Sequence, residues 1–259
     1  MLALLSPAKS LDLESPLPTR KHTEPRLLEA SEELVRVLRG KSVSQVAELM
    51  GISDELAALN VERYTSFELP FTTRNARPAM LMFSGDVYQG LDARERFDAR
   101  DWTEAQKTLR VLSGLYGLLR PLDLIQPYRL EMGTHLATER GTTLYQYWGS
   151  RITDLVAADL AGSPGPDVVV NLASAEYAGA VKFDELDARV VTPRFEDRDR
   201  SGNWKVISFP AKRARGEMAG WLVTERVRSV KAITEFDGGG YRYAAEVSSP
   251  DQPVFRKLA

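Results

Sequence analysis

Two lysines occupy matching positions near the two ends of the chain. Lys9 and Lys212 each follow the dipeptide Pro-Ala after a short apolar run. A lysine at a strand end suits two kinds of chemistry, because its ammonium group binds phosphate and its desolvated amine forms a Schiff base with a carbonyl. Asp86 and Glu176 are the carboxylates that we expect to act as acid or base beside such an amine. Either the two Pro-Ala-Lys segments form the two halves of one cationic site, or their similarity is a coincidence of how two strands end.

The second lysine belongs to a run of positive charge. Lys205, Lys212, Arg213 and Arg215 place four cations within eleven residues, and no acidic residue occurs in that run before Glu217. A basic cluster that opens a helix binds a polyanion, and the positive end of the helix dipole adds to the attraction. A solvated helix face is the usual role of such a charge run, and the sequence leaves both interpretations open.

A glycine-rich segment suggests a second phosphate contact. Ser113, Gly114 and Gly117 follow a predicted helix and precede a segment that again has helical spacing. Paired glycines allow a tight turn whose backbone N–H groups point outward and receive a phosphate. The alternative is a glycine that only ends the helix, followed by an ordinary turn.

Two further segments combine charge with rigidity or with a strand end. Arg120, Tyr128 and Arg129 lie in a proline-containing stretch where the arginines either bind phosphates or form an internal network with nearby acids. Residues 171–177 put polar side chains at the exit of a buried strand, with Lys182 just downstream. Strand ends are common places for sites in α/β proteins, although such residues also cap turns.

The elements that must position these residues alternate between strand and helix. Helices are expected to begin near residue 24 and to end at Gly40, with others at 42–50, from 53, and at 103–112, 144–160 and 212–227; strands are expected at 2–5, 79–83, 168–172, 190–195, 204–209 and 241–247. The order lacks a strict βα repeat. It therefore predicts a mixed α/β fold (α+β) with a mixed sheet and flanking helices, not a doubly wound parallel sheet.

Composition narrows the class of protein. With 259 residues, 43% of them hydrophobic, the chain suits one compact domain, and the Gly and Pro residues at 162–166 mark the one place for a subdivision. There is no cysteine, which excludes disulfides, thiolate metal sites and thiolate peroxidase chemistry. His22 and His135 form no metal-spaced pair, so we expect no metal site and no cofactor.

Charge and apolar runs bear on partners and location. The net charge of -2 gives no global attraction for polyanions, so any nucleic-acid surface must be local. Apolar runs such as 2–5 and 168–170 are too short to cross a bilayer, and the start of the chain does not look like a signal peptide. We therefore expect a cytoplasmic protein.

Taken together, the motifs resemble the YaaA family of peroxide-stress proteins over essentially the whole chain. The resemblance rests on nine segments in order: Ser6-Pro7-Ala8-Lys9, Gly85-Asp86-Val87-Tyr88, Leu112-Ser113-Gly114-Leu115-Tyr116-Gly117, Arg120-Pro121-Leu122-Asp123, Pro127-Tyr128-Arg129-Leu130-Glu131-Met132, Tyr145-Gln146-Tyr147-Trp148-Gly149, Asn171-Leu172-Ala173-Ser174, Glu176-Tyr177 and Ala211-Lys212-Arg213-Ala214-Arg215-Gly216. Each segment alone is weak. Nine in the same order are specific.

The resemblance implies a bacterial protein that protects DNA during hydrogen peroxide stress and is linked to a lower level of free iron. It also implies DNA binding through a positively charged cleft and a helix-hairpin-helix element, which we place near residues 103–131, on a fold unlike the common superfolds. The expected partner is DNA, duplex or distorted, with little sequence specificity, and the expected state is a monomer of one domain over residues 1–259.

Three functions follow as hypotheses. In the first, DNA phosphates contact a set of cations and turn residues: Lys9, Ser113, Gly114, Gly117, Arg120, Tyr128, Arg129, Lys182, Lys212, Arg213 and Arg215. In the second, an enzyme acts on damaged nucleic acid or a nucleotide through Lys9 or Lys212, with Asp86 or Glu176 as acid or base. In the third, Asp86, Tyr128 and Glu131 bind iron directly. We favour the first hypothesis; the sequence leaves open whether a catalytic step exists.

Overall fold

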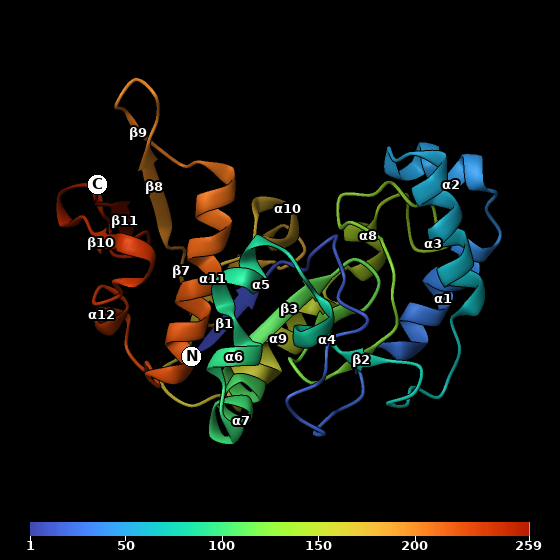
Figure 1. The fold of residues 1–259 in the computed structure, drawn as a ribbon, viewed down its shortest axis with the longest axis horizontal. Coiled ribbons are helices and arrows are strands. Elements are labelled where there is room, and N and C mark those ends of the chain that lie inside the picture. The colour runs from blue at the N-terminus through green and yellow to red at the C-terminus, as the bar shows by residue number, and fades with distance from the viewer. Residues whose placement is uncertain (259) are drawn as a thin grey trace.

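The amino-terminal strand β1 (Leu2–Leu5) lies at the centre of a five-stranded sheet (Figure 1). In the computed structural model, which describes residues 1–258, the strand order is β4-β3-β1-β6-β7. β1 pairs in parallel with β3 (Leu109–Ser113) and β6 (Val168–Asn171), and all of its residues are buried. A strand covered on both faces is expected to be apolar throughout, as this one is.

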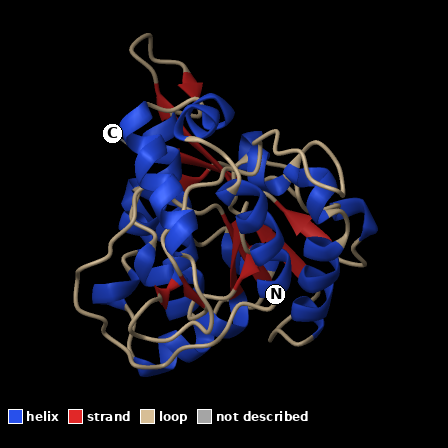
Figure 2. Cartoon of the chain, turned by 90° about the vertical axis from the view of Figure 1, so that its right-hand side faces the viewer, coloured by secondary structure: helices blue, strands red, loops and turns tan. Residues whose placement is uncertain are grey.

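The edges of this sheet make it mixed. β4 (Gly117–Leu119) runs antiparallel to β3, whereas β7 (Arg189–Val191) runs parallel to β6. Helices pack outside the strands (Figure 2). The predicted mixed α/β class is therefore confirmed.

Three helices gather at one end of the molecule (Figure 1): α1 (Leu28–Arg39), α2 (Val43–Met50) and α3 (Asp54–Ser66). Local signals fix their ends. Gly40 ends α1, Ser42 caps α2 in a reciprocal capping box with Gln45, and Ser53 caps α3. All three helices were predicted: the bounds of α1 and α2 agree to within a few residues, and α3 starts where expected, but its end was not predicted.

A four-stranded sheet lies at the opposite end, in the order β10-β11-β8-β9. Its strands are β10 (Tyr241–Tyr243), β11 (Val254–Lys257), β8 (Arg194–Arg198) and β9 (Trp204–Lys205). The strand expected at 190–195 falls on β7 and the start of β8, which belong to different sheets. The strand expected at 204–209 is limited to β9, which pairs with β8, because residues from Ser208 onward are helical. β11 was not predicted from the sequence.

The remaining elements are mostly short. They are β2 (Arg77–Pro78), β5 (Leu124–Ile125), α4 (Ala79–Met82), α5 (Asp86–Leu91), α6 (Ala93–Arg96), α7 (Ala99–Thr108), α8 (Leu144–Trp148), α9 (Arg151–Ala161), α10 (Ala175–Ala178), α11 (Ser208–Thr224) and α12 (Val230–Ile233), with 3-10 turns at Phe183–Glu185, Gly238–Gly240 and Ala245–Val247.

Three more predicted elements differ from the structure. The strand expected at 79–83 is the helix α4, whose residues are all buried, so no hydrophobic period distinguishes strand from helix there. The helix expected at 103–112 is α7, which starts earlier because Asp98 caps it, and it ends where β3 begins. The helix expected at 144–160 is split into α8 and α9 by Gly149, which has a positive φ of 56°.

The helix-hairpin-helix element expected at 103–131 is also corrected. The described backbone there runs from α7 into β3, through a turn to β4, and on to β5. The two glycines therefore turn a β-hairpin, and Gly117 adopts the left-handed φ of 70° that this turn requires. Pairing of Val111 with Leu5 of β1 outweighs the local helical pattern, a tertiary contact that sequence spacing does not show.

A buried ion-pair network connects Arg26, which lies just before α1, to the helix α9 and to the central sheet. The Asp159 carboxylate on α9 accepts hydrogen bonds from Arg26 at 2.7 Å and from Arg110 on β3 at 2.6 Å. Burial raises the pKa of Asp159, but the hydrogen bonds and charges of the two arginines outweigh it and leave that pKa below its ordinary value. The side chain of Arg110 is only 5% exposed, so its charge depends on this partner.

The contact between α5 and α11 brings two helix backbones together. A Cβ added to Gly216 would lie 1.7 Å from the Val87 carbonyl oxygen, and one added to Gly90 would lie 2.0 Å from that of Arg213. Only glycine permits this approach. The predicted helix at 212–227 is therefore present, but it begins four residues earlier, at Ser208.

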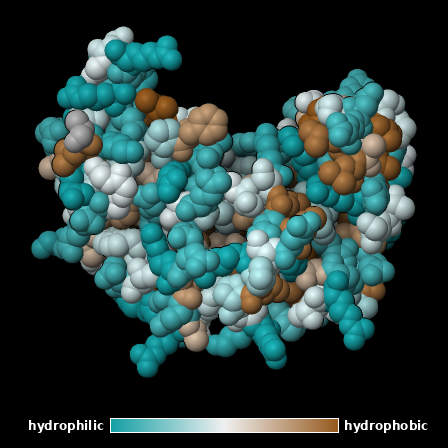
Figure 3. All heavy atoms as spheres, in the orientation of Figure 1, coloured by the Kyte–Doolittle hydropathy of each residue, from teal (hydrophilic) through white to brown (hydrophobic). Residues whose placement is uncertain are grey.

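The face shown in Figure 3 is hollowed between two raised ends, and hydrophilic residues cover much of it. In the same orientation, α5 and α10 lie between those ends (Figure 1). No helix within residues 1–258 is long and apolar enough to span a membrane.

Candidate functional site

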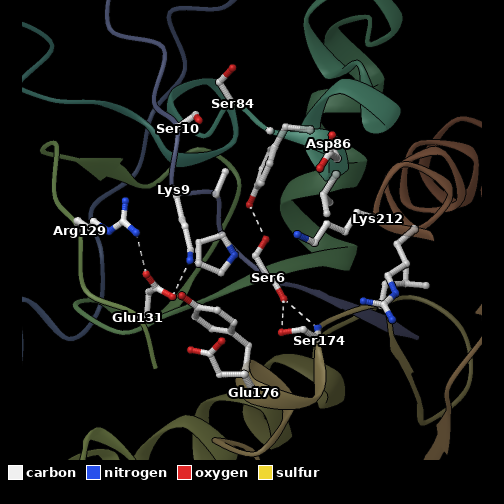
Figure 4. Close-up of a pocket in the computed structure, with 18 of the residues that line it drawn as sticks. Ser6, Lys9, Ser10, Ser84, Asp86, Arg129, Glu131, Ser174, Glu176 and Lys212 are labelled. Atoms are coloured by element: carbon white, nitrogen blue, oxygen red, sulfur yellow. Dashed lines mark hydrogen bonds and ion pairs between the residues drawn. The ribbon is translucent and has the colours of Figure 1, made fainter. Parts of the chain in front are cut away.

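A cavity of about 370 Å³ lies at the carboxyl end of β1 (Figure 4). Five parts of the chain line it: residues 6–10, 84–88, 128–131, 172–177, and the helix α11 through Lys212 and Arg215. β1 and β6 are parallel neighbours, so their carboxyl ends meet at this edge. Edges of this kind are where α/β proteins commonly bind ligands.

Ser6 fixes the wall of the cavity where β1 ends. Its hydroxyl accepts a hydrogen bond from the Ser174 backbone N–H at 2.9 Å, and its carbonyl accepts one from the Tyr88 hydroxyl at 3.0 Å. Pro7 then stops the strand and turns the chain toward Lys9. The ends of β1 and β6 and the helix α5 are thereby held together by polar contacts.

Lys9 belongs to a three-residue charge cluster on one side of the cavity. Its ammonium group lies 2.9 Å from the Glu131 carboxylate, which also accepts from Arg129 at 3.1 Å. The Lys9 side chain is 62% exposed. Arg129 keeps a buried Nε without a hydrogen-bond partner among the described residues. Glu131 thus neutralises part of the positive charge that the two cations bring.

Lys212 and Arg215 contribute charge from the opposite wall. In Figure 4, Lys212 points from α11 toward the middle of the cavity, and Asp86 of α5 lies beside it. Within residues 1–258, neither cation has a carboxylate partner or a hydrogen-bond acceptor. Burial lowers the pKa of the Arg215 guanidinium, which keeps its proton all the same at neutral pH. These two cations are the groups open to an incoming anion.

The floor of the cavity is made of phenol groups that stay protonated. Tyr88, Tyr128 and Tyr177 are buried, and burial raises the pKa of each hydroxyl above its ordinary value. The Tyr128 hydroxyl is paired with the Ser113 hydroxyl at 2.6 Å. Glu176, at the cavity edge, accepts a hydrogen bond from the Gly133 N–H at 2.9 Å.

Direct iron binding finds little support in this arrangement. No group of three or more His, Asp or Glu side chains within residues 1–258 is placed to hold a metal ion. Glu131 is engaged by two cations, and Tyr128 is a protonated phenol in a hydrogen bond. A coordinating oxygen must be both deprotonated and free; the Tyr128 phenol is protonated, and the Glu131 carboxylate is already paired with two cations.

The structure brings together eight of the residues singled out in the sequence: Lys9, Asp86, Tyr128, Arg129, Glu131, Glu176, Lys212 and Arg215. The two Pro-Ala-Lys segments therefore do meet at one cavity. Three other predicted cations lie outside it. Arg120 forms an internal pair with Asp123 at 2.9 Å, Lys182 pairs with Glu185 at 3.0 Å, and Arg213 pairs with Glu217 at 3.3 Å.

The predicted phosphate contacts at Ser113, Gly114 and Gly117 are corrected. All three residues are buried. The carbonyl of Gly114 accepts a hydrogen bond from the Trp148 indole at 3.0 Å, and Ser113 bonds Tyr128. Because the residues of this turn are buried, its backbone N–H groups are not open to a phosphate from solvent. The glycines serve the packing of the hairpin.

Some residues of the cavity were assigned another role, or none, from the sequence. Glu131 was proposed as an iron ligand and not as the partner of Lys9. Ser6 and Tyr177 line the cavity and stand inside quoted motifs but were not singled out. Their positions next to Lys9 and Glu176 in those motifs were the available signal. Spacing gave no reason to prefer them over their neighbours.

The charges of the cavity add to a small positive excess. Four cations, Lys9, Arg129, Lys212 and Arg215, face three carboxylates, Asp86, Glu131 and Glu176, which gives a net charge of +1. Glu131 is paired with Lys9 and Arg129, whereas Lys212 and Arg215 have no carboxylate partner within residues 1–258, so the unpaired positive charge lies on the α11 wall. The arrangement suits an anion carried by a ligand that enters the cavity.

Comparison with known proteins gives a consistent relationship. A family model described as peroxide stress protein YaaA matches residues 1–247. A UPF0246 protein of Cellvibrio japonicus is 50% identical over 257 residues, covering 99% of this chain and 98% of the relative. UPF0246 proteins of Idiomarina loihiensis and Alcanivorax borkumensis are 52% and 49% identical, over 255 and 257 residues, with at least 98% of each chain covered.

Proposed function

Since this chain belongs to the family of the peroxide stress protein YaaA, we propose that it acts in peroxide stress by binding DNA at the cavity where β1 ends. The observation that carries the proposal is the pair of cations on α11. Lys212 and Arg215 face the cavity without a partner of opposite charge among the described residues. A DNA phosphate supplies that partner, and protection of the bound DNA is the role we assign to the contact.

Binding through phosphates has physical consequences. The chain as a whole carries a net charge of -2, so attraction to DNA must come from this local excess. Phosphate contacts fix the position of a protein on DNA but read no sequence, so we expect little sequence preference. Each contact also releases counterions, so affinity must fall with salt. All parts of the cavity come from one chain, and we expect a monomer to suffice.

The implied link to lower free iron enters this proposal only indirectly. Residues 1–258 hold no converging set of three metal-ligating side chains. We therefore assign the cavity to DNA binding. Any change in free iron would then result from a process other than iron binding in this cavity.

A second candidate function, an enzyme acting on a nucleotide or on damaged nucleic acid, is favoured by one observation. The volume of about 370 Å³ lies within the range of about 300 to 1,000 Å³ that small-ligand sites occupy. A nucleophilic lysine, however, needs a desolvated amine. The Lys9 side chain is 62% exposed and paired with Glu131, which is the opposite environment. Borohydride trapping of a covalent complex with abasic DNA tests this candidate, and the DNA-binding proposal expects none.

The experiment that tests DNA binding compares variants of one helix. Fluorescence anisotropy of a labelled duplex and a labelled single strand is measured over a series of salt concentrations. The wild type is compared with a Lys212→Ala, Arg215→Ala double variant and with Arg213→Ala as the matched control. Arg213 lies on the same helix, has 62% of its side chain exposed and is absent from the cavity wall.

The expected result differs between the cavity-facing residues of α11 and the control residue Arg213. Loss of two phosphate contacts should make the slope of log K against log salt shallower by roughly 1.4 for single strands and 1.8 for duplex. Arg213→Ala should leave the slope of the wild type almost unchanged. Equal slopes in all three proteins, or a larger effect of Arg213→Ala, would overturn the proposal.

A further inference from the structure

Phe209 is the most exposed of the large apolar side chains within residues 1–258, with 70% of its surface open to solvent. It lies in the first turn of α11, just after the hairpin of β8 and β9. Single apolar residues on a surface are normal and need no explanation by themselves. Phe209 differs from the other exposed apolar residues because it lies next to Lys212, a cation of the cavity.

The ring stands next to a cation of the cavity. The Lys212 ammonium group lies 5.8 Å from the centroid of the Phe209 ring, and Lys212 lines the cavity. Residues three apart on a helix are neighbours, so Phe209, Lys212 and Arg215 follow one another along α11. Exposure falls along this row, from the open ring at the rim to the partly buried Arg215 in the wall.

We propose that Phe209 is a stacking platform for a base of a single-stranded nucleic acid whose phosphate is bound by Lys212 and Arg215. The inference rests on the DNA-binding function proposed above and specifies the form of its ligand. Aromatic side chains beside a positively charged groove are the combination that binds single strands, because every base presents a π-face whatever its identity.

A duplex fits this arrangement less well. Its bases are already stacked on one another, so a ring that stands beside a phosphate site meets only the outside of the helix. A single strand, or an unpaired end, presents base and phosphate at once.

The positive charge beside the Phe209 ring favours a nucleotide base over a purely apolar partner. Val206 is the nearest other exposed apolar residue in sequence, at 44% exposure. Lys205 is already paired with Asp199 at 2.7 Å, so Lys212 is the cation beside the ring that has no carboxylate partner within residues 1–258. Two apolar side chains make a small patch, and the unpaired ammonium group calls for an anion. A nucleotide supplies both the flat apolar face and the negative charge.

The test uses three labelled nucleic-acid probes: an eight-residue oligodeoxythymidylate, an abasic strand of the same length, and an eight-base-pair duplex. Vesicles containing anionic lipid are the fourth probe. Phe209→Ala is compared with wild type, with Phe209→Trp and with Leu56→Ala. Leu56 is 42% exposed on α3, so its loss controls for removing an exposed apolar side chain elsewhere.

The proposal predicts a loss of about tenfold in affinity for the thymidylate strand in Phe209→Ala, the usual effect of removing one base-stacking ring. Affinity for the abasic strand should stay within about twofold, because its phosphates still meet Lys212 and Arg215. Phe209→Trp should retain the affinity of the wild type, and Leu56→Ala should change nothing.

Other outcomes overturn the proposal in distinguishable ways. If Phe209→Ala leaves all three affinities unchanged while the abasic strand binds with a steep salt dependence, DNA binding stands and the stacking role falls. If wild type binds none of the probes at low salt, both fall. If Phe209→Ala weakens only the binding of vesicles containing anionic lipid, the ring contacts a membrane surface and the base platform is refuted.

Discussion

The close contact of α5 and α11 makes the substitution Gly216→Ala a sharp test of how the cavity is built. The added methyl group would lie 1.7 Å from the Val87 carbonyl oxygen, 2.7 Å from its carbonyl carbon and 2.8 Å from the Leu91 nitrogen. All three are backbone atoms, which cannot rotate away as a side chain does. The two helices must therefore separate, and they carry Asp86 on one side and Lys212 on the other.

The magnitude follows from two opposing effects. Overpacking of a tight contact costs typically about 1 to 3 kcal/mol, and a backbone clash belongs at the upper end of that range. Replacing glycine by alanine inside a helix returns about 1 kcal/mol. The expected net loss in the free energy of unfolding is about 2 kcal/mol, which for a chain of this size lowers Tm by roughly 4 to 8 °C.

The assay is thermal unfolding followed by circular dichroism, with Gly40→Ala as the control. Gly40 ends α1, and a Cβ there would meet nothing closer than the Val37 carbonyl at 3.5 Å. We expect the control to stay within about 0.5 kcal/mol of wild type. Gly90→Ala, which strikes the same contact from α5, should lower Tm as well, and the double variant should lose less than the sum of the two.

A Tm of Gly216→Ala equal to or above that of wild type would refute this account of the contact. DNA affinity measured at a temperature where the variant is folded supplies a second readout. It should fall, because separating the helices moves Lys212 away from the opposite wall.

Two further predictions concern buried and exposed charge. Asp159→Asn should destabilise the protein by about 3 to 5 kcal/mol in urea unfolding, since it leaves the buried charge of Arg110 unpaired. The pKa of Asp159 is lowered in the folded state, so its contribution is present above the ordinary value of 3.8 and is lost as pH falls through the folded pKa. The gap in stability between wild type and variant should therefore shrink below about pH 4, and a gap that is constant down to pH 2 would contradict the ion-pair explanation. Glu131→Gln should tighten binding of a labelled single strand by about two- to fivefold, because Lys9 is freed from its carboxylate partner; weaker binding would show that Glu131 positions Lys9 and does not compete for it.

Local signals were enough to predict part of the fold. Ser42 and Ser53 cap their helices through their own side chains, and Gly40 ends α1, so neighbours in sequence decide these boundaries. The buried strand β1 was likewise visible as an apolar run halted by Pro7. Each of these features depends on residues within a few positions.

Features that depend on distant residues were not predictable in this way. Residues 109–119 form a hairpin because β3 pairs with β1, and the glycines between its strands looked equally suited to a turn between helices. The same limit applies to the basic run on α11. Nothing in the spacing separates Lys212 from Arg213, and only the packing of Gly216 against α5 shows which one faces the cavity.

The motifs of the family resemblance supplied what spacing did not. The motifs include both Lys9 and Lys212, and the fold places both lysines at the same cavity. They also pointed to Ser113 and Gly114, which are buried in a hairpin. A motif residue can therefore serve packing instead of contact with a ligand, and exposure in the fold tells the two apart.

The most direct test of the account is a crystal structure of the protein with a short oligodeoxythymidylate bound. The account predicts a phosphate within hydrogen-bonding distance of the Lys212 ammonium group and the Arg215 guanidinium, at the mouth of the cavity. A strand bound elsewhere on the surface, with both of these side chains left in contact with water alone, would contradict it.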